Sequence, residues 1–128
     1  MGLLLSVSVN TLYAEPATLT GSAYYRERIA LPGNAVFEAV LEDVSLMDIA
    51  AVVLGSDSTT PAGQPPFAFA IKYDSTEIKP GHRYNVRAKI TVDGKLKFIS
   101  DTMHPVLKGE NQSELLVKMV MVKSIQGK

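Results

Sequence analysis

The sequence predicts an all-β domain, an antiparallel β-sandwich of the immunoglobulin-like type with about seven strands. Three observations lead to this fold class. Apolar and polar residues alternate with a period of two along most of the chain, turn-forming residues separate these stretches at regular intervals, and no stretch has the apolar spacing of a long amphipathic helix. The chain of 128 residues is long enough for one domain with its own core.

The N-terminal segment, MGLLLSVSVNTLYAEP, allows two interpretations. Its apolar run ends near the small residue Ala14, as an export signal does, although no basic residue precedes the run. The alternation in SVSVN is equally typical of a strand. We therefore expect residues 1–16 to be a residual export signal or an extra N-terminal strand, followed by one β-sandwich domain at residues 17–124.

Two alternating strands, joined by a turn, open the predicted domain. They cover residues 18–29 and 34–43, and Pro32-Gly33-Asn34 between them is a typical turn sequence because each residue favours turn geometry. The positions expected to face the core are Leu19, Ala23, Tyr25, Ile29, Phe37, Ala39 and Leu41.

The middle of the chain is less regular. Residues 49–54 are a short continuous apolar run, whose length favours a buried strand. Residues 55–66, GSDSTTPAGQPP, contain the densest group of turn formers and predict a mobile loop. Alternation returns at residues 67–73 and again in a last strand at 114–123. The expected inward residues of these two strands are Phe67, Phe69, Ile71, Tyr73, Leu115, Val117, Met119 and Met121.

A hairpin is predicted for residues 84–100, YNVRAKITVDGKLKFIS, and its register has to be chosen. A two-residue Asp93-Gly94 loop would turn lysines towards the core, which is costly. A three-residue loop at 92–94, closed by Gly94 with a positive φ, shifts the pairing by one residue. We therefore expect the three-residue loop. The expected cross-strand pairs are Thr91–Lys95, Ile90–Leu96 and Ala88–Phe98.

This register lines the outer face of the hairpin with four basic residues and places Lys89 opposite Lys97. The four are Arg87, Lys89, Lys95 and Lys97. One interpretation is that they keep the sheet soluble and prevent pairing between sheet edges. The other is that they bind an acidic peptide or anionic lipid head groups. We take them as the candidate binding residues.

The composition argues against several kinds of chemistry. The absence of cysteine excludes disulfides and thiolate sites in this chain, and a net charge of zero gives no global field that would attract nucleic acid. His82 and His104 lack metal-ligand spacing, and no serine lies in a G-x-S-x-G motif. We expect no cofactor, no metal, no nucleic-acid partner and no enzymatic activity. A hydrolase would need a pocket that brings His82 or His104 within hydrogen-bonding reach of a carboxylate.

Residues 21–48, GSAYYRERIALPGNAVFEAVLEDVSLMD, resemble the YbaY family of bacterial lipoproteins, which groups with the YscW-type pilotins of type III secretion. The resemblance continues at residues 66–74, 83–98 and 100–106, so that it covers residues 18–122. The pattern is closer to the YbaY branch than to the pilotin branch.

The resemblance implies a non-enzymatic β-sandwich at the periplasmic side of an outer membrane. For the pilotin branch it implies a chaperone whose partner is another envelope protein or peptide, such as the C-terminal tail of a secretin subunit. It implies membrane contact only through a lipid anchor, whose cysteine is absent from this chain. The alternative function is a periplasmic domain that binds a small molecule, a glycan or a lipid, through residues 115–122 or the loop 55–66.

Overall fold

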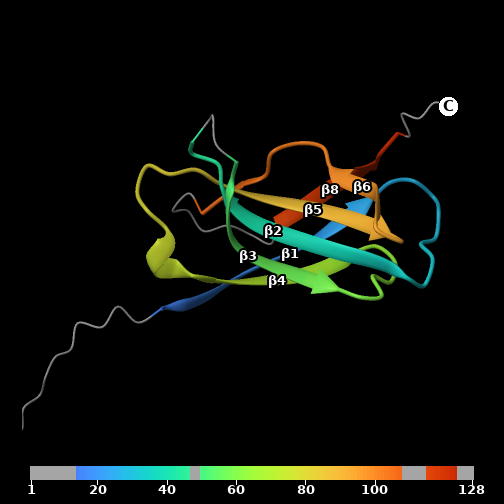
Figure 1. The fold of residues 1–128 in the computed structure, drawn as a ribbon, viewed down its shortest axis with the longest axis horizontal. Helices are drawn as coiled ribbons and strands as arrows, with labels where there is room; N and C mark the ends of the chain where they lie inside the picture. Colours follow the sequence, from blue (N-terminus) through green and yellow to red (C-terminus); the bar gives the residue numbers. More distant parts are fainter. Residues whose placement is uncertain (1–13, 47–49, 108–114, 124–128) are drawn as a thin grey trace, which may run out of the picture.

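The all-β prediction is confirmed by the structure, a computed structural model that describes residues 14–46, 50–107 and 115–123 (Figure 1). Most of the predicted N-terminal signal or strand, residues 1–13, lies outside the described residues. Apart from strands, the described residues contain one short 3-10 turn, η1 (Ser75–Glu77). The strands are β1 (Pro16–Tyr25), β2 (Ala35–Asp43), β3 (Val52–Thr59), β4 (Phe67–Asp74), β5 (Tyr84–Val92), β6 (Lys95–Ser100), β7 (Pro105–Val106) and β8 (Leu115–Met121).

The strands belong to one sheet, in the order β3-β2-β5-β6-β8-β1-β4, with β7 beside β5. Their ladders are antiparallel except that β1 and β8 run parallel. The sheet curls until its end strands meet, since the Ala70 N–H of β4 donates to Asp57 Oδ2 of β3 at 2.8 Å. The result is a nearly closed, barrel-like sheet (Figure 1). The predicted immunoglobulin-like sandwich of two sheets is not confirmed.

The inward residues of the curled sheet form the core. Alternate positions of β2, β4 and β5 are buried, as a period of two requires for strands with one face inside. Aromatic rings meet in this core, with Tyr25 stacked on Phe98 at 4.2 Å and Phe37 on Phe67 at 5.2 Å between centroids. The predicted inward residues that are buried are Ala23, Tyr25, Phe37, Ala39, Leu41, Phe67, Phe69, Ile71, Val117 and Met119.

Three predicted inward residues or segments are placed differently. Ile29 is exposed because β1 already ends at Tyr25. Met121 is exposed at the end of β8. In the predicted buried strand 49–54, Val52 and Val53 are exposed, and Ile49 lies outside the described residues.

Residues 55–59, predicted as part of a loop, are the second half of β3. They pair with β2, from Leu41 opposite Gly55 to Phe37 opposite Thr59. A Cβ atom on Gly55 would collide with the carbonyl oxygen of Lys72, so the glycine that suggested a turn instead lets β4 pass close to β3. Tertiary pairing therefore overrides the local turn signal.

The predicted hairpin loop is wrong in length but right about Gly94. Asp93 and Gly94 form a two-residue loop with φ of 55° and 77°, the combination that a type I′ turn needs. A bulge between Ile90 and Thr91 then shifts the register and brings Ile90 opposite Phe98 in the core. The observed pairs are Val92–Lys95, Thr91–Leu96, Ile90–Phe98 and Lys89–Ile99. The bulge, rather than a longer loop, keeps the lysines out of the core.

Candidate functional site

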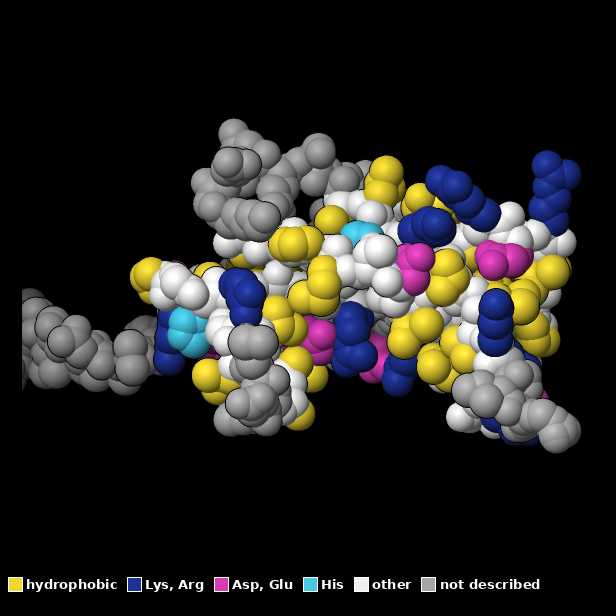
Figure 2. All heavy atoms as spheres, turned by 90° about the horizontal axis from the view of Figure 1, so that it is seen from above, with side chains coloured by type: hydrophobic (Ala, Val, Ile, Leu, Met, Phe, Trp, Pro, Cys, Tyr) yellow, Lys and Arg dark blue, Asp and Glu magenta, His cyan; other side chains and the backbone are white. Residues whose placement is uncertain are grey.

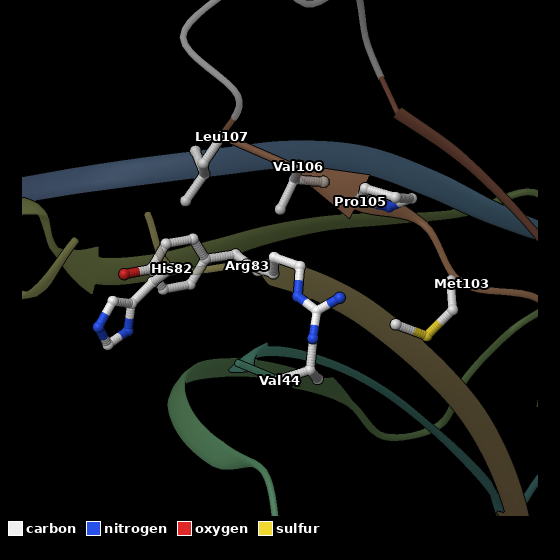
Figure 3. A pocket seen from close by; sticks show the side chains of 8 residues that line it. Val44, His82, Arg83, Met103, Pro105, Val106 and Leu107 are labelled. Carbon is white, nitrogen blue, oxygen red and sulfur yellow. The ribbon is translucent and has the colours of Figure 1, made fainter. Parts of the chain in front are cut away.

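A cavity of about 380 Å³ lies where β5 begins and β2 ends, and we call it the histidine-end pocket (Figure 3). In Figure 3, Val106 and Leu107 lie on one side of Arg83 and Val44 lies on the other. The pocket is lined by Val44, His82, Arg83, Tyr84, Met103, Pro105, Val106 and Leu107. Six of these eight residues are apolar or aromatic, and the other two are basic.

Asn85 holds one wall of the histidine-end pocket in place. This buried side chain accepts a hydrogen bond from the His104 N–H through Oδ1 at 2.7 Å, and its Nδ2 donates to Glu42 Oε2 at 3.4 Å. The short strand β7 then pairs with the start of β5, with Val106 opposite Tyr84. A buried amide with partners on both sides fixes a loop far better than apolar contact alone, because leaving either group unpaired is costly.

The opposite wall is fixed by a network around Asp43. The Asp43 carboxylate contacts His82 Nδ1 at 2.6 Å through Oδ2 and accepts the Ser45 hydroxyl at 2.6 Å through Oδ1. Ser45 Oγ in turn accepts the Arg83 N–H at 2.7 Å. Partial burial alone would raise the pKa of Asp43, but the hydrogen bonds from Ser45 and His82 outweigh it and lower this pKa to about 2. The carboxylate is thus ionised and holds both rim residues.

This geometry meets one condition that a hydrolase would need, namely a histidine bonded to a carboxylate beside a pocket. It does not supply a nucleophile, because Ser45 donates to Asp43 and not to the imidazole. A serine must contact the histidine to be activated by it. The Asp43–His82 pair therefore has a structural role, since it joins the end of β2 to the segment that leads into β5.

His104 occupies a different setting from His82. Its ring Nδ1 lies 3.2 Å from the Thr102 carbonyl oxygen, and burial lowers its pKa although Asp101 acts in the opposite direction. Within residues 14–46, 50–107 and 115–123, no group of three or more His, Asp or Glu side chains is arranged to hold a metal ion.

A second concave surface of about 430 Å³ lies at the opposite end of β5, and we call it the hairpin-end groove. It is formed by the β1–β2 connection, the ends of β5 and β8, and β6. Its lining consists of Ile29, Ala30, Leu31, Pro32, Val92, Lys97, Phe98, Met121 and Val122. The side chain of Gln64 holds the backbone of the lining residue Leu31, since Oε1 accepts the Leu31 N–H at 2.9 Å and Nε2 donates to the Leu31 carbonyl at 3.1 Å.

The four predicted binding residues fall into two groups. Arg87 is paired with Glu42 at 2.9 Å and Lys89 with Glu38 at 3.4 Å, both on the neighbouring strand β2. The prediction that Lys89 faces Lys97 is wrong, because the bulge puts Ile99 opposite Lys89. Lys95 and Lys97 are exposed at the hairpin end, and Lys97 lines the hairpin-end groove. Binding by the four residues stays a prediction.

Sequence reasoning missed most of the histidine-end pocket. Arg83 and Met103 lie in segments of the family resemblance that assign them no role, and only the fold brings residues 44, 82–84 and 103–107 together. One signal for the ion pairs was available. Glu38 and Glu42 share a face of β2, and an antiparallel neighbour with basic residues two positions apart can meet them.

Three comparisons with known proteins agree on the kind of protein. The model of the type III secretion system lipoprotein chaperone family, YscW, matches residues 14–119. The uncharacterized lipoprotein YbaY of Escherichia coli strain K12 is 37% identical over 90 residues, which are 70% of this chain and 47% of that protein. The chain thus spans about half the length of this curated relative.

The fold also matches a solved structure, an alternative pilotin from the type II secretion system of Vibrio cholerae. The two chains share 44% sequence identity with a TM-score of 0.79, and the match covers 85% of this chain and 99% of the pilotin. A secretion chaperone family and a pilotin are non-enzymatic proteins, which confirms the prediction that the chain is not an enzyme. From the family model and the 37% identical lipoprotein together, the chain belongs to the YscW family of secretion-system lipoprotein chaperones.

Proposed function

We propose that this chain is a pilotin-like chaperone that binds a tail segment of another envelope protein, such as the C-terminal tail of a secretin subunit, in the histidine-end pocket. The observation that carries the proposal is the pocket itself, an apolar cavity of about 380 Å³ with two basic side chains at its rim. Its volume lies within the range of about 300–1,000 Å³ that is usual for ligand pockets.

The chemistry of the pocket favours a particular kind of segment. Val106, Leu107 and Met103 offer an apolar surface for one or two side chains of the partner. Arg83 beside them suits a carboxylate, either an acidic side chain or a chain terminus, because guanidinium groups bind carboxylates through two parallel hydrogen bonds. The proposed ligand is therefore a short segment with apolar side chains next to a carboxylate.

The relatives support a place in the cell envelope, in association with the outer membrane. We propose that the domain faces the periplasm, where a secretin subunit would meet it. Within the described residues there is no helix of the length and apolarity that crossing a bilayer requires. The family is named for type III secretion and the solved relative comes from type II secretion, so the proposal covers a secretin of either system.

A peptide-binding measurement tests the proposal. Fluorescently labelled peptides from the C-terminal tails of secretins encoded in the same genome are titrated with the chain, and binding is followed by anisotropy. Arg83→Glu removes one charge-assisted bond, and Met103→Asp puts a charge on the apolar lining, both at exposed positions of the pocket. We expect each to weaken binding by at least about tenfold.

The matched control is Lys72→Glu, which makes the same charge change on the exposed face of β4. This variant should bind the peptide as the unchanged chain does. If no secretin tail binds, or if Lys72→Glu weakens binding as much as Arg83→Glu, the pocket is not the site of a tail segment and the proposal fails.

The second candidate function is the binding of a small molecule, either a lipid or a glycan. The observation in its favour is the hairpin-end groove, where Met121 and Val122 at the end of β8 contribute apolar lining to about 430 Å³. Native mass spectrometry of the chain isolated from envelope extract checks this candidate. A retained lipid or glycan of defined mass, lost on Met121→Asp, would support it.

A further inference from the structure

The hairpin end of the molecule exposes large apolar side chains from three separate segments. Ile29 is 46% exposed, Leu96 40%, Met121 42% and Val122 36%. They lie in the β1–β2 connection, in β6 and at the end of β8, and the Val122 N–H donates to the Lys97 carbonyl at 2.9 Å, which joins two of these segments. Ile29, Met121 and Val122 line the hairpin-end groove, and Leu96 directly precedes its lining residue Lys97 in β6.

Basic side chains come from the same three segments. They are Arg26, Arg28, Lys95, Lys97 and Lys123, and all five are exposed. The acidic residues of these segments and the turn are Glu27 and Asp93, and Asp93 Oδ1 already accepts the Asn34 side-chain amide at 2.6 Å. The ion pairs found among the described residues involve none of the five basic residues. Figure 2 shows hydrophobic and basic side chains next to one another at the right-hand end of the molecule.

We propose that the hairpin end docks on a membrane surface that contains anionic lipid. In such a surface, hydrocarbon lies just beneath a layer of phosphate groups, so exposed apolar side chains and surrounding cations can both be satisfied at once. The whole chain has a net charge of zero, so the attraction is that of this local cluster. An acidic peptide would use the cations, but it would leave the apolar side chains of three segments without a partner.

A molecule docked on the membrane through its hairpin end could still bind a ligand in the histidine-end pocket. The membrane docking does not depend on that ligand. Strand β5 runs from Tyr84 in the histidine-end pocket to Val92 in the hairpin-end groove. Eight steps of about 3.3 Å separate these ends by roughly 26 Å. A molecule docked through the hairpin end thus leaves the histidine-end pocket open to the aqueous side.

A single tryptophan reports the contact, because the chain has none of its own. Leu96→Trp places the reporter at the hairpin end, and Leu46→Trp places it at an exposed position just beyond β2, near the histidine end. The probes are vesicles of phosphatidylcholine with phosphatidylglycerol and vesicles of phosphatidylcholine alone. We expect the tryptophan emission of L96W to shift to shorter wavelength and to be quenched by brominated lipid only with the anionic vesicles, and the emission of L46W to stay unchanged.

Charge reversal supplies the second arm of the test. Lys95→Glu combined with Lys97→Glu should weaken cosedimentation with anionic vesicles by at least about fivefold, since each lysine near such a surface contributes about that factor. Lys72→Glu combined with Lys79→Glu reverses the same number of charges at exposed positions elsewhere. This control should alter cosedimentation with anionic vesicles by less than about twofold. Raised salt should also weaken binding, because the Debye length falls to about 3 Å at 1 M.

Four outcomes of the experiments with reporters and vesicles overturn the proposal. They are no shift of L96W emission, an equal shift of both reporters, an equal loss in the two double variants, and equal binding to vesicles without anionic lipid. Binding of polyglutamate by the unchanged chain, without binding to anionic vesicles, also overturns it and makes the partner an acidic polypeptide. Melting curves confirm that each variant is folded. None of the substituted residues lines the histidine-end pocket, so failure of the membrane proposal leaves the peptide-binding test standing.

Discussion

The two ends of β5 share β2 as a neighbour but are otherwise held in different ways, with β7 beside the histidine end and β6 beside the hairpin end. At the histidine end, Asn85 and the Asp43 network form hydrogen bonds that fix both walls of a pocket. At the hairpin end, the backbone shape depends on a two-residue turn with positive φ angles and on a bulge. The apolar and basic side chains described above are exposed there. A pocket prepared for one ligand geometry needs fixed walls, whereas a surface that docks on lipid needs only the right residues on its outside.

The largest expected effect comes from removing the buried amide at the histidine end. Asn85→Ala leaves the His104 N–H without its acceptor, and we expect a loss of about 2 kcal/mol in the free energy of unfolding. Urea denaturation measures it. The matched control is Asn34→Ala at the hairpin end, which removes an exposed bond to Asp93 and should cost less than about 0.5 kcal/mol. Equal costs would mean that the two ends are not held differently.

Asp43→Asn should cost about 1.5 kcal/mol at pH 7, because the bonds from Ser45 and His82 to a charged carboxylate are lost. The direction in which the stabilising contribution of Asp43 changes with pH follows from its lowered pKa. A carboxyl group whose pKa falls to about 2 on folding contributes stability above its ordinary pKa and loses it as the pH falls towards 2. The difference between the unchanged chain and the variant should therefore shrink from about pH 5 to about pH 2.

Carboxyl NMR titration checks the cause of this behaviour. Ser45→Ala removes the first of the hydrogen bonds that lower the pKa of Asp43, so this pKa should rise towards its ordinary value. An unchanged titration of Asp43 in this variant would contradict the network described for the histidine end.

The hairpin end should respond mainly to its turn. Gly94→Ala should cost about 1 kcal/mol, because a residue with a Cβ is strained at a φ of +77° although nothing lies within 4 Å of the new atom. Gly33→Ala is the control, since its surroundings are equally open and its φ lies outside the left-handed region. Thermal unfolding should show no loss for this control. A loss of equal size would indicate packing rather than backbone strain.

The smallest effect on the free energy of unfolding is expected from a substitution in the middle of β5, between its two ends. Lys89→Ala removes a surface ion pair with Glu38 at 3.4 Å, and such exposed pairs contribute less than about 0.5 kcal/mol. Urea denaturation should place this variant within error of the unchanged chain. A loss above about 1 kcal/mol, twice the usual value of such a pair, would contradict the view that Lys89 and Glu38 form a solvated surface pair.

The correctly predicted parts of the fold are those in which the residue type and its immediate neighbours in sequence determine the local structure. Phe37, Ala39 and Leu41 are buried because alternation places them on one face of a strand whichever neighbour it pairs with. Gly94 has its positive φ because Asp-Gly favours such turns in any hairpin. The predicted basic residues were placed on the outer face for the same reason, and Lys95 and Lys97 are exposed there.

Several wrong predictions depend on contacts that the local sequence does not show. Residues 55–59 have a turn-like composition, yet β2 and β4 hold them as a strand. The hairpin register needed a bulge at Ile90, whose advantage appears only when Phe98 has a core to enter. Asp43 meets His82 across 39 positions of sequence, so no spacing rule could have paired them.

The sequence by itself determined that this protein is a β-sheet protein with an apolar inner face, because the direction of a side chain in a strand depends only on residue parity. It also determined the family, through motifs that can be recognised without any knowledge of the structure. Only the tertiary structure decided that the sheet curls on itself and that a pocket and a basic, apolar end lie at opposite ends of β5. The physical reason is that strand order, bulges and buried polar bonds are fixed by contacts between segments that the sequence keeps far apart.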